Sequence, residues 1–73
     1  MESYKNYTIL VDVKEVIPPL SSGHKYSGQL NRVFDLNTKE DVRIFAHISH
    51  AETKHEAVQL VMNEVKKKID NIN

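Results

Sequence analysis

The sequence has no cysteine and no tryptophan, and its 73 residues include only two glycines and two prolines. Without cysteine the chain forms no disulfide, no thiolate–metal site and no cysteine nucleophile. With only Gly23 and Gly28 it lacks the glycine-rich loop that binds phosphate groups in nucleotide-binding proteins. A small domain without disulfides must obtain its stability from a well-packed core or from oligomerisation.

The sequence also lacks net charge and long apolar runs. Ten Lys and Arg residues balance ten Asp and Glu residues, and neither half of the chain has an excess of one sign. This balance argues against binding led by a uniformly basic surface. No apolar run approaches the roughly 20 residues that span a bilayer, and the first residues lack the pattern of a secretory signal. We therefore expect a cytoplasmic protein with no membrane partner, and the frequent Lys, Asn and Ile are typical of an AT-rich bacterial or phage genome.

Three segments show the alternation of apolar and polar residues that is typical of half-buried strands. They cover residues 6–17, 26–36 and 41–49, and the second is predicted to contain a β-bulge at Gly28. Short links between the segments favour an antiparallel meander. One face of this sheet is predicted to carry the core residues Ile9, Val11, Val13, Leu30, Phe34, Ile44, Ala46 and Ile48.

A stretch of turn-forming residues separates the first two strands. Pro18 and Pro19 cannot donate hydrogen bonds to a sheet, and serine and glycine residues follow them. The stretch 18–25 is therefore predicted to be a loop that ends the first strand and borders the binding surface.

The apolar period changes to that of a helix near residue 53. Thr53 and Glu56 match a capping box, in which each side chain satisfies the other's backbone N–H, and Ser49 with Glu52 is a competing box four residues earlier. A helix is predicted over residues 53–70. Its apolar stripe comprises Val58, Val61, Met62, Val65, Ile69 and Ile72.

The predicted elements follow the order β-β-β-α, which defines an α+β fold. One helix with one apolar stripe covers one face of a three-stranded antiparallel meander. Residues 1–73 are therefore predicted to form a single domain with the helix packed on one face of the sheet. The other face is left open and is predicted to carry Leu10, Asp12, Lys14, Val33, Arg43, Phe45 and His47.

The open face is the main indication of function. Apolar residues lie among charges on it, and a domain this small gains stability from a partner. The sequence predicts a non-enzymatic interaction or regulatory module that acts through protein–protein contacts, either with a second copy as a homodimer or with another protein. The predicted partner-binding residues are Leu10, Val33, Arg43, Phe45 and His47.

Catalytic motifs are missing from the sequence. Ser21 and Ser22 lie near His24, but a neighbour in sequence is rarely the geometric partner that a nucleophile and its base require. There is no G-x-S-x-G motif, and no pair of carboxylates has a spacing that marks acid–base chemistry. We therefore expect no enzyme activity, no catalytic residue and no cofactor.

Nucleic-acid binding through the open face is the first alternative. An antiparallel sheet followed by a helix is a scaffold that several nucleic-acid-binding domains use, although a fold does not determine a function. Basic side chains bind phosphates and an aromatic ring stacks on a base. The residues for this function are Lys14, Lys25, Tyr26, Arg32 and Arg43, and the acidic Asp12 and Glu15 among them disfavour it.

A metal site is the second alternative. His47, His50 and His55 lie at the predicted junction between the third strand and the helix. Imidazole nitrogens are ligands for zinc, nickel and copper. The spacing matches no defined metal motif, and H-E-x-x-H is absent, so the main expectation is that the protein holds no metal.

Overall fold

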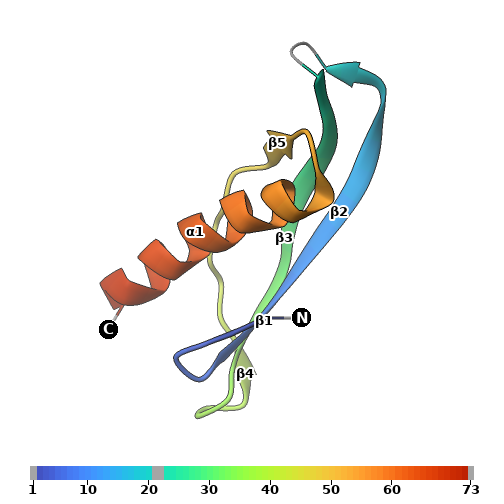
Figure 1. Ribbon diagram of the computed structural model, residues 1–73. Helices are drawn as coiled ribbons and strands as arrows, with labels where there is room; N and C mark the ends of the chain where they lie inside the picture. The colour runs from blue at the N-terminus through green and yellow to red at the C-terminus, as the bar shows by residue number, and fades with distance from the viewer. Residues whose placement is uncertain (1, 21–22, 73) are drawn as a thin grey trace.

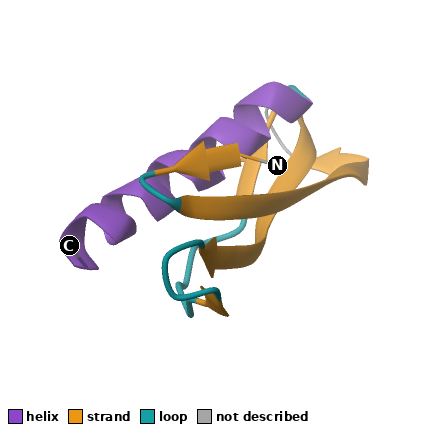
Figure 2. Ribbon diagram, turned by 90° about the horizontal axis from the view of Figure 1, so that it is seen from below, coloured by secondary structure: helices purple, strands orange, loops and turns teal. Residues whose placement is uncertain are grey.

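The computed structural model describes residues 2–20 and 23–72. These residues form an antiparallel sheet with one C-terminal helix packed on one face (Figure 1). Seen along the sheet, the helix forms one layer and the strands form the other (Figure 2). The predicted α+β class and the β-β-β-α arrangement are therefore confirmed.

Two long strands form a hairpin at the centre of the sheet, β2 (Tyr7–Leu20) and β3 (His24–Asp35). They pair antiparallel with each other along most of their length. The remaining elements are β1 (Glu2–Tyr4), β4 (Glu40–Asp41), β5 (Ser49–Ala51) and the helix α1 (Lys54–Ile72).

The short strand β1 is not among the predicted strands. It pairs with the first residues of β2, from Glu2 opposite Ile9 to Tyr4 opposite Tyr7. Lys5 and Asn6 connect the two strands with φ values of 46° and 67°. Two successive residues at positive φ make a type I′ turn, whose twist matches that of a two-stranded ribbon.

The predicted loop over residues 18–25 is wrong at both ends. β2 continues to Leu20 and β3 begins at His24, while residues 21–22 lie outside the described part of the chain. The register between the two strands is irregular from Glu15 to Leu20. That stretch contains both prolines, which have no N–H to donate, so they interrupt the ladder without ending the strand.

The predicted position of the bulge in β3, at Gly28, is wrong: the bulge lies at Asn31. Leu10 and Val11 are consecutive in β2 and pair with Arg32 and Leu30. Asn31 is therefore the extra residue of β3. An extra residue moves every later side chain of the strand to the opposite face.

The bulge exchanges the predicted faces of Val33 and Phe34. Val33 is 2% exposed and lies in the core beneath the helix. Phe34 lies on the open face, beside Thr8 and Leu10. The predictions that Val33 faces outward and that Phe34 faces the core are therefore both wrong.

The predicted strand over residues 41–49 is wrong as a continuous strand. Its two ends form β4 and β5, which pair with opposite ends of β3, but residues 42–48 join no ladder. The N–H of Val42 donates to the carbonyl oxygen of Val33 at 2.8 Å, and beyond this point the chain leaves the strand.

The predicted alternation of side chains nevertheless holds along most of this segment. Val42, Ile44 and Ala46 are half-buried and pack against the core. Arg43, Phe45 and His47 are exposed, as is Ile48, which was expected in the core. The period of the sequence thus predicted the faces of this segment but not its hydrogen-bonding partner.

The core lies between α1 and the covered face of the sheet. The predicted apolar stripe of the helix is confirmed at most positions, while Ile72 is 56% exposed. Thr53 caps the helix as predicted, because its Oγ1 accepts a hydrogen bond from the Glu56 N–H at 3.1 Å. The fully or almost fully buried apolar residues are Tyr7, Ile9, Val33, Ala51, Ala57, Val61, Met62, Val65 and Ile69.

The molecule is elongated, with extents of 41 by 18 by 17 Å along its principal axes. Its length comes from the β2–β3 hairpin, which extends past the helix at one end (Figure 1). Among the described residues, no helix is long and apolar enough to cross a membrane.

Candidate protein interface

The face of the sheet that the helix leaves uncovered carries an apolar hollow of about 310 Å³, lined by Thr8, Leu10, Arg32 and Phe34. Leu10 and Phe34 are half-buried in it. The Arg32 guanidinium lies 5.2 Å from the centre of the Phe34 ring, and its Nε donates to Asp41 Oδ1 at 2.5 Å. The basic group nearest to the apolar hollow is therefore already neutralised by an acidic partner.

Further along the hairpin, the same face becomes polar. Asp12, Lys14, Ser27 and Gln29 line a second, smaller hollow of about 150 Å³. The Asn31 amide donates to Asp12 Oδ2 at 2.8 Å, and Lys14 forms no ion pair with any described residue. Around the two hollows, Lys14 and Arg32 contribute positive charge, while Asp12 and Asp41 contribute negative charge.

The outer edge of β2 is the second surface without a partner. β1 pairs only with the first three residues of β2, Tyr7 to Ile9. Beyond them, no described strand pairs with the outer side of β2. An unpaired edge presents a row of backbone N–H and C=O groups to any chain that approaches it.

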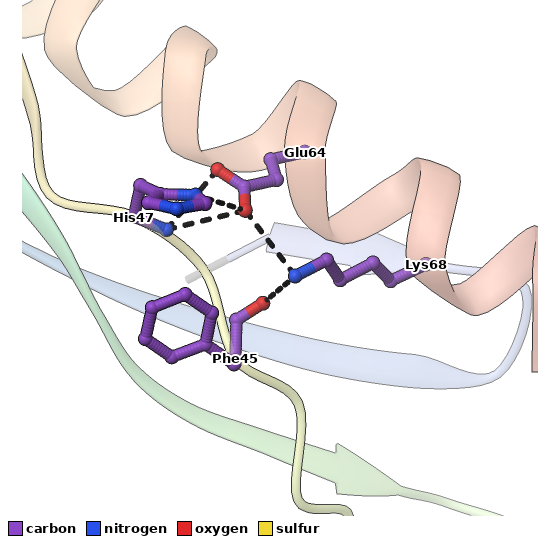
Figure 3. A network of polar contacts seen from close by, with 4 residues as sticks. All are labelled: Phe45, His47, Glu64 and Lys68. Carbon is purple, nitrogen blue, oxygen red and sulfur yellow. Dashed lines mark hydrogen bonds and ion pairs between the residues drawn. The ribbon is translucent and has the colours of Figure 1, made fainter.

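Beyond the opposite edge of the sheet, between β4 and β5, segment 42–48 is held by side chains of the helix instead of by a strand. Glu64 accepts hydrogen bonds from the His47 backbone N–H at 3.1 and 3.2 Å, and its Oε2 lies 3.0 Å from His47 Nδ1 (Figure 3). Lys68 donates to the carbonyl oxygen of Phe45 and lies 3.3 Å from Glu64 Oε2. The helix thus satisfies backbone groups of segment 42–48 that a neighbouring strand would otherwise satisfy.

Glu64 is negatively charged in this network. Burial alone raises the pKa of its carboxyl, but hydrogen bonds from the His47 ring, the His47 backbone and Lys68 outweigh burial and hold the pKa below its ordinary value. The Phe45 ring lies edge-on to His47, with ring centroids 5.0 Å apart, and 5.1 Å from the Lys68 ammonium. Phe45 is nevertheless 67% exposed, so this edge also offers an aromatic side chain to the solvent.

The predicted partner-binding residues do not form one patch. Leu10 lies on the open face as predicted, whereas Val33 lies in the core. Arg43, Phe45 and His47 lie on the exposed side of segment 42–48, beyond the far edge of β3.

Phe34 and the free edge of β2 were not predicted to contribute to the site. Val33 and Phe34 are adjacent apolar residues, which showed that one of them must face outward, but the sequence did not show which. The free edge follows from strand order, which the sequence also left open.

The residues predicted for nucleic-acid binding are also spread over the molecule. Arg32 pairs with Asp41, and the Tyr26 ring lies 5.9 Å from the Lys54 ammonium. Lys14 lies four residues from the β2 residue opposite Arg32, about 13 Å at the rise of a strand. Lys25 is exposed on β3 and Arg43 on segment 42–48, so no continuous basic surface follows from these positions.

The histidines predicted for the alternative metal site lie on three different elements: His47 on segment 42–48, His50 on β5 and His55 on α1. His47 is engaged with Glu64. Among residues 2–20 and 23–72, no group of three or more His, Asp or Glu side chains is arranged to hold a metal ion.

Comparisons of the chain with models of protein families, with curated proteins and with solved structures found no match. Function is therefore inferred from the surfaces described above: an open face with balanced charge, the free edge of β2, and an opposite edge occupied by segment 42–48.

Proposed function

We propose that this chain is a non-enzymatic module that acts through protein–protein contacts, and that its first partner is a second copy of itself. The observation that carries the proposal concerns residues 2–20 and 23–72: the helix covers one face of the sheet, while no described element covers the other face or pairs with the outer edge of β2 beyond Ile9. A single layer of helix on a sheet leaves a face and an edge that a second molecule can cover and pair with.

The charge on these surfaces supports a second copy as the partner. In a twofold contact, the same patch must complement itself, so any charge on it needs an opposite charge on the same patch. The two hollows of the open face have both signs at hand, Lys14 and Arg32 with Asp12 and Asp41. A polyanion would instead need cations that are free of acidic partners.

The test is the molecular mass of the purified protein across a range of concentrations. Sedimentation velocity and light scattering are expected to show a mass that rises with concentration toward twice the 8.4 kDa of one chain. The same samples are passed over duplex DNA and RNA at low salt, where we expect no retention. A mass of one chain at every concentration would overturn the proposal, and salt-sensitive retention on nucleic acid would replace it with the first alternative.

A further inference from the structure

The free edge of β2 determines which backbone groups are available to a second chain. Among the described residues, β1 occupies this edge only as far as Ile9. In Figure 1, β2 forms the outer margin of the molecule above the β1 hairpin. Beyond Ile9, the edge comprises residues 10–17, up to the prolines.

The turn between β1 and β2 sets the direction of these groups. Tyr4 and Tyr7 flank a two-residue type I′ turn, so the N–H and C=O of Tyr7 face β1. The carbonyl oxygen of Asn6, one residue earlier, accepts from the Leu36 N–H on the β3 side at 2.9 Å. Because backbone groups alternate along a strand, the odd-numbered residues of β2 direct their hydrogen-bonding groups to the outer edge.

Three residues therefore present backbone groups on this edge that pair with no described strand: Val11, Val13 and Glu15. Their side chains lie on the helix side of the sheet, where Val11 and Val13 are half-buried. Between them, Asp12 and Lys14 are exposed on the open face. The edge thus combines outward backbone groups with an acidic and a basic side chain two residues apart.

We propose that two copies pair their β2 strands antiparallel about a twofold axis at Val13. This inference rests on the proposed function, and it names the contact through which the second copy binds. In this register, Val13 lies opposite Val13 of the second copy, and Asp12 lies opposite Lys14 of the second copy. Val11 lies opposite Glu15, and the paired edges exchange about six backbone hydrogen bonds, since each hydrogen-bonded pair exchanges two.

The charge pattern selects this register over its neighbours. With the axis at Val13, both Asp12–Lys14 pairs are directly opposite and of opposite sign, which stabilises an antiparallel pair. An axis at Val11 would place the second strand on the part of β2 that β1 already occupies. An axis at Glu15 would set the two Glu15 side chains against each other, and directly opposed like charges are destabilising.

The edge also explains why pairing stops at two copies. The contact uses the same edge of both molecules, so it is isologous and closes on itself. The ladder of β2 with β3 becomes irregular after Glu15, and Pro18 and Pro19 cannot donate to a strand partner. On its other side, β3 is paired by β4 and β5 at both ends, so the described residues offer no second long edge for a fibre.

The first experiment exchanges the two charges. Lys14→Glu and Asp12→Lys each place two like-charge pairs in the dimer, and each is expected to weaken association by about tenfold or more in sedimentation velocity. An equimolar mixture of the two variants is expected to associate, because both pairs in the heterodimer are again of opposite sign. The double variant D12K/K14E is expected to regain self-association for the same reason.

The matched control is Lys67→Glu, which makes the same charge change at an exposed position of α1. It is expected to leave the dissociation constant of the dimer unchanged. Circular dichroism and a urea transition of every variant establish that the fold is intact, which matters for Asp12→Lys because Asp12 accepts a hydrogen bond from Asn31.

The second experiment uses the absence of cysteine. In Val13→Cys, the only thiols of a dimer meet at the twofold axis, where paired Cα atoms lie about 5.5 Å apart, within the range of a disulfide. Mild oxidation is expected to give a covalent dimer with the same sedimentation coefficient as the wild-type dimer. Leu60→Cys, on the exposed back of the helix, is the control that should remain uncrosslinked under the same conditions.

Phe34→Glu separates edge pairing from packing of two open faces. Phe34 lies on β3, one strand inward from the edge, so this variant is expected to leave an edge-paired dimer intact. If the wild-type protein dimerises but Phe34→Glu abolishes the dimer, or if the charge exchanges have no effect and Val13→Cys does not crosslink, the edge contact is wrong and the proposed function stands. A wild-type mass of one chain at every concentration overturns both.

Discussion

At the scale of single residues, Gly28 sets how closely the helix approaches the sheet. A Cβ atom at this position would lie 2.7 Å from the carbonyl oxygen of Ala57 and 3.2 Å from Val61 Cγ2. Both atoms belong to buried residues of α1, so neither has free space to move into. The sequence pattern favoured a bulge at this glycine, whereas its actual role is to allow the close contact of a helix with a strand.

We therefore predict that Gly28→Ala destabilises the protein by about 1–3 kcal/mol, the usual cost of forcing extra atoms into a packed core. Urea unfolding monitored by circular dichroism measures the change. Gln29→Ala, at the next and exposed position, is the control and should change stability by less than about 0.5 kcal/mol. Higher stability of Gly28→Ala, as expected for Gly→Ala in an unobstructed strand, would contradict the close approach.

At the scale of elements, segment 42–48 lies against the molecule without belonging to the sheet. Its inward side chains pack against the core, and two of its backbone groups bond to side chains of α1. Glu64 is the centre of this contact, because it accepts from the backbone and the ring of His47 and lies beside Lys68. The alternation in the sequence predicted a strand here, which is wrong for residues 42–48, although it predicted most of the inward and outward faces correctly. Alternation does not specify which groups satisfy the backbone.

Glu64→Gln is expected to destabilise the protein by about 1 kcal/mol at pH 7, since it removes the charged acceptor of several hydrogen bonds. The pKa of Glu64 is lower in the folded protein than its ordinary value of 4.5. Its contribution is therefore complete above pH 4.5 and is lost as the pH falls through the lowered pKa. Urea unfolding of the wild type and the variant between pH 7 and pH 3 measures this loss.

The wild type is expected to lose more stability than Glu64→Gln over this acid range, so the two curves converge at low pH. Glu40→Gln is the matched control, because Glu40 is exposed on β4 and its side chain forms no ion pair within the described part of the chain. Parallel curves for wild type and Glu64→Gln would show that Glu64 does not hold the segment.

At the scale of the whole molecule, the two ends of the described chain are joined. The Tyr4 hydroxyl donates to Asp70 at 2.9 and 3.1 Å, and Lys5 donates to the same carboxylate at 2.6 Å. The Lys66 ammonium lies 5.5 Å from the centre of the Tyr4 ring. These contacts connect the β1–β2 turn to the last turns of α1, more than sixty residues away in sequence.

The pKa values of Tyr4, Lys5 and Asp70 determine the pH range over which this contact stabilises the protein. Hydrogen bonds from Lys5 and Tyr4 lower the pKa of Asp70, and the hydrogen bond to Asp70 raises the pKa of both Tyr4 and Lys5. The contribution of Asp70 is lost as the pH falls through its lowered pKa. The contributions of Tyr4 and Lys5 are lost as the pH rises through their raised pKa values. The contact therefore stabilises the protein most at pH values above the lowered pKa of Asp70 and below the raised pKa values of Tyr4 and Lys5.

Asp70→Ala is expected to loosen both joined segments with little effect on global stability, since Lys5 and Asp70 are exposed and their charges are screened by solvent. Hydrogen exchange at neutral pH should speed up at the backbone amides of β1 and of the last turn of α1, by a few-fold, while exchange of the core of α1 is unchanged. Asn71→Ala, the adjacent exposed residue, is the control. Equal exchange in Asp70→Ala and the wild type would show that the contact does not restrain these segments.

The sequence by itself determined the fold class, the helix with its cap, and the outward and inward alternation of most strand residues. These properties depend on local periodicity and capping chemistry, which every short segment carries within itself. Only the tertiary structure decided that Val33 is buried and Phe34 is on the open face, that segment 42–48 bonds to a helix, and that β2 has a free edge. These features depend on which strands are neighbours and on one extra residue at Asn31, and a period of two is the same whichever strand lies alongside.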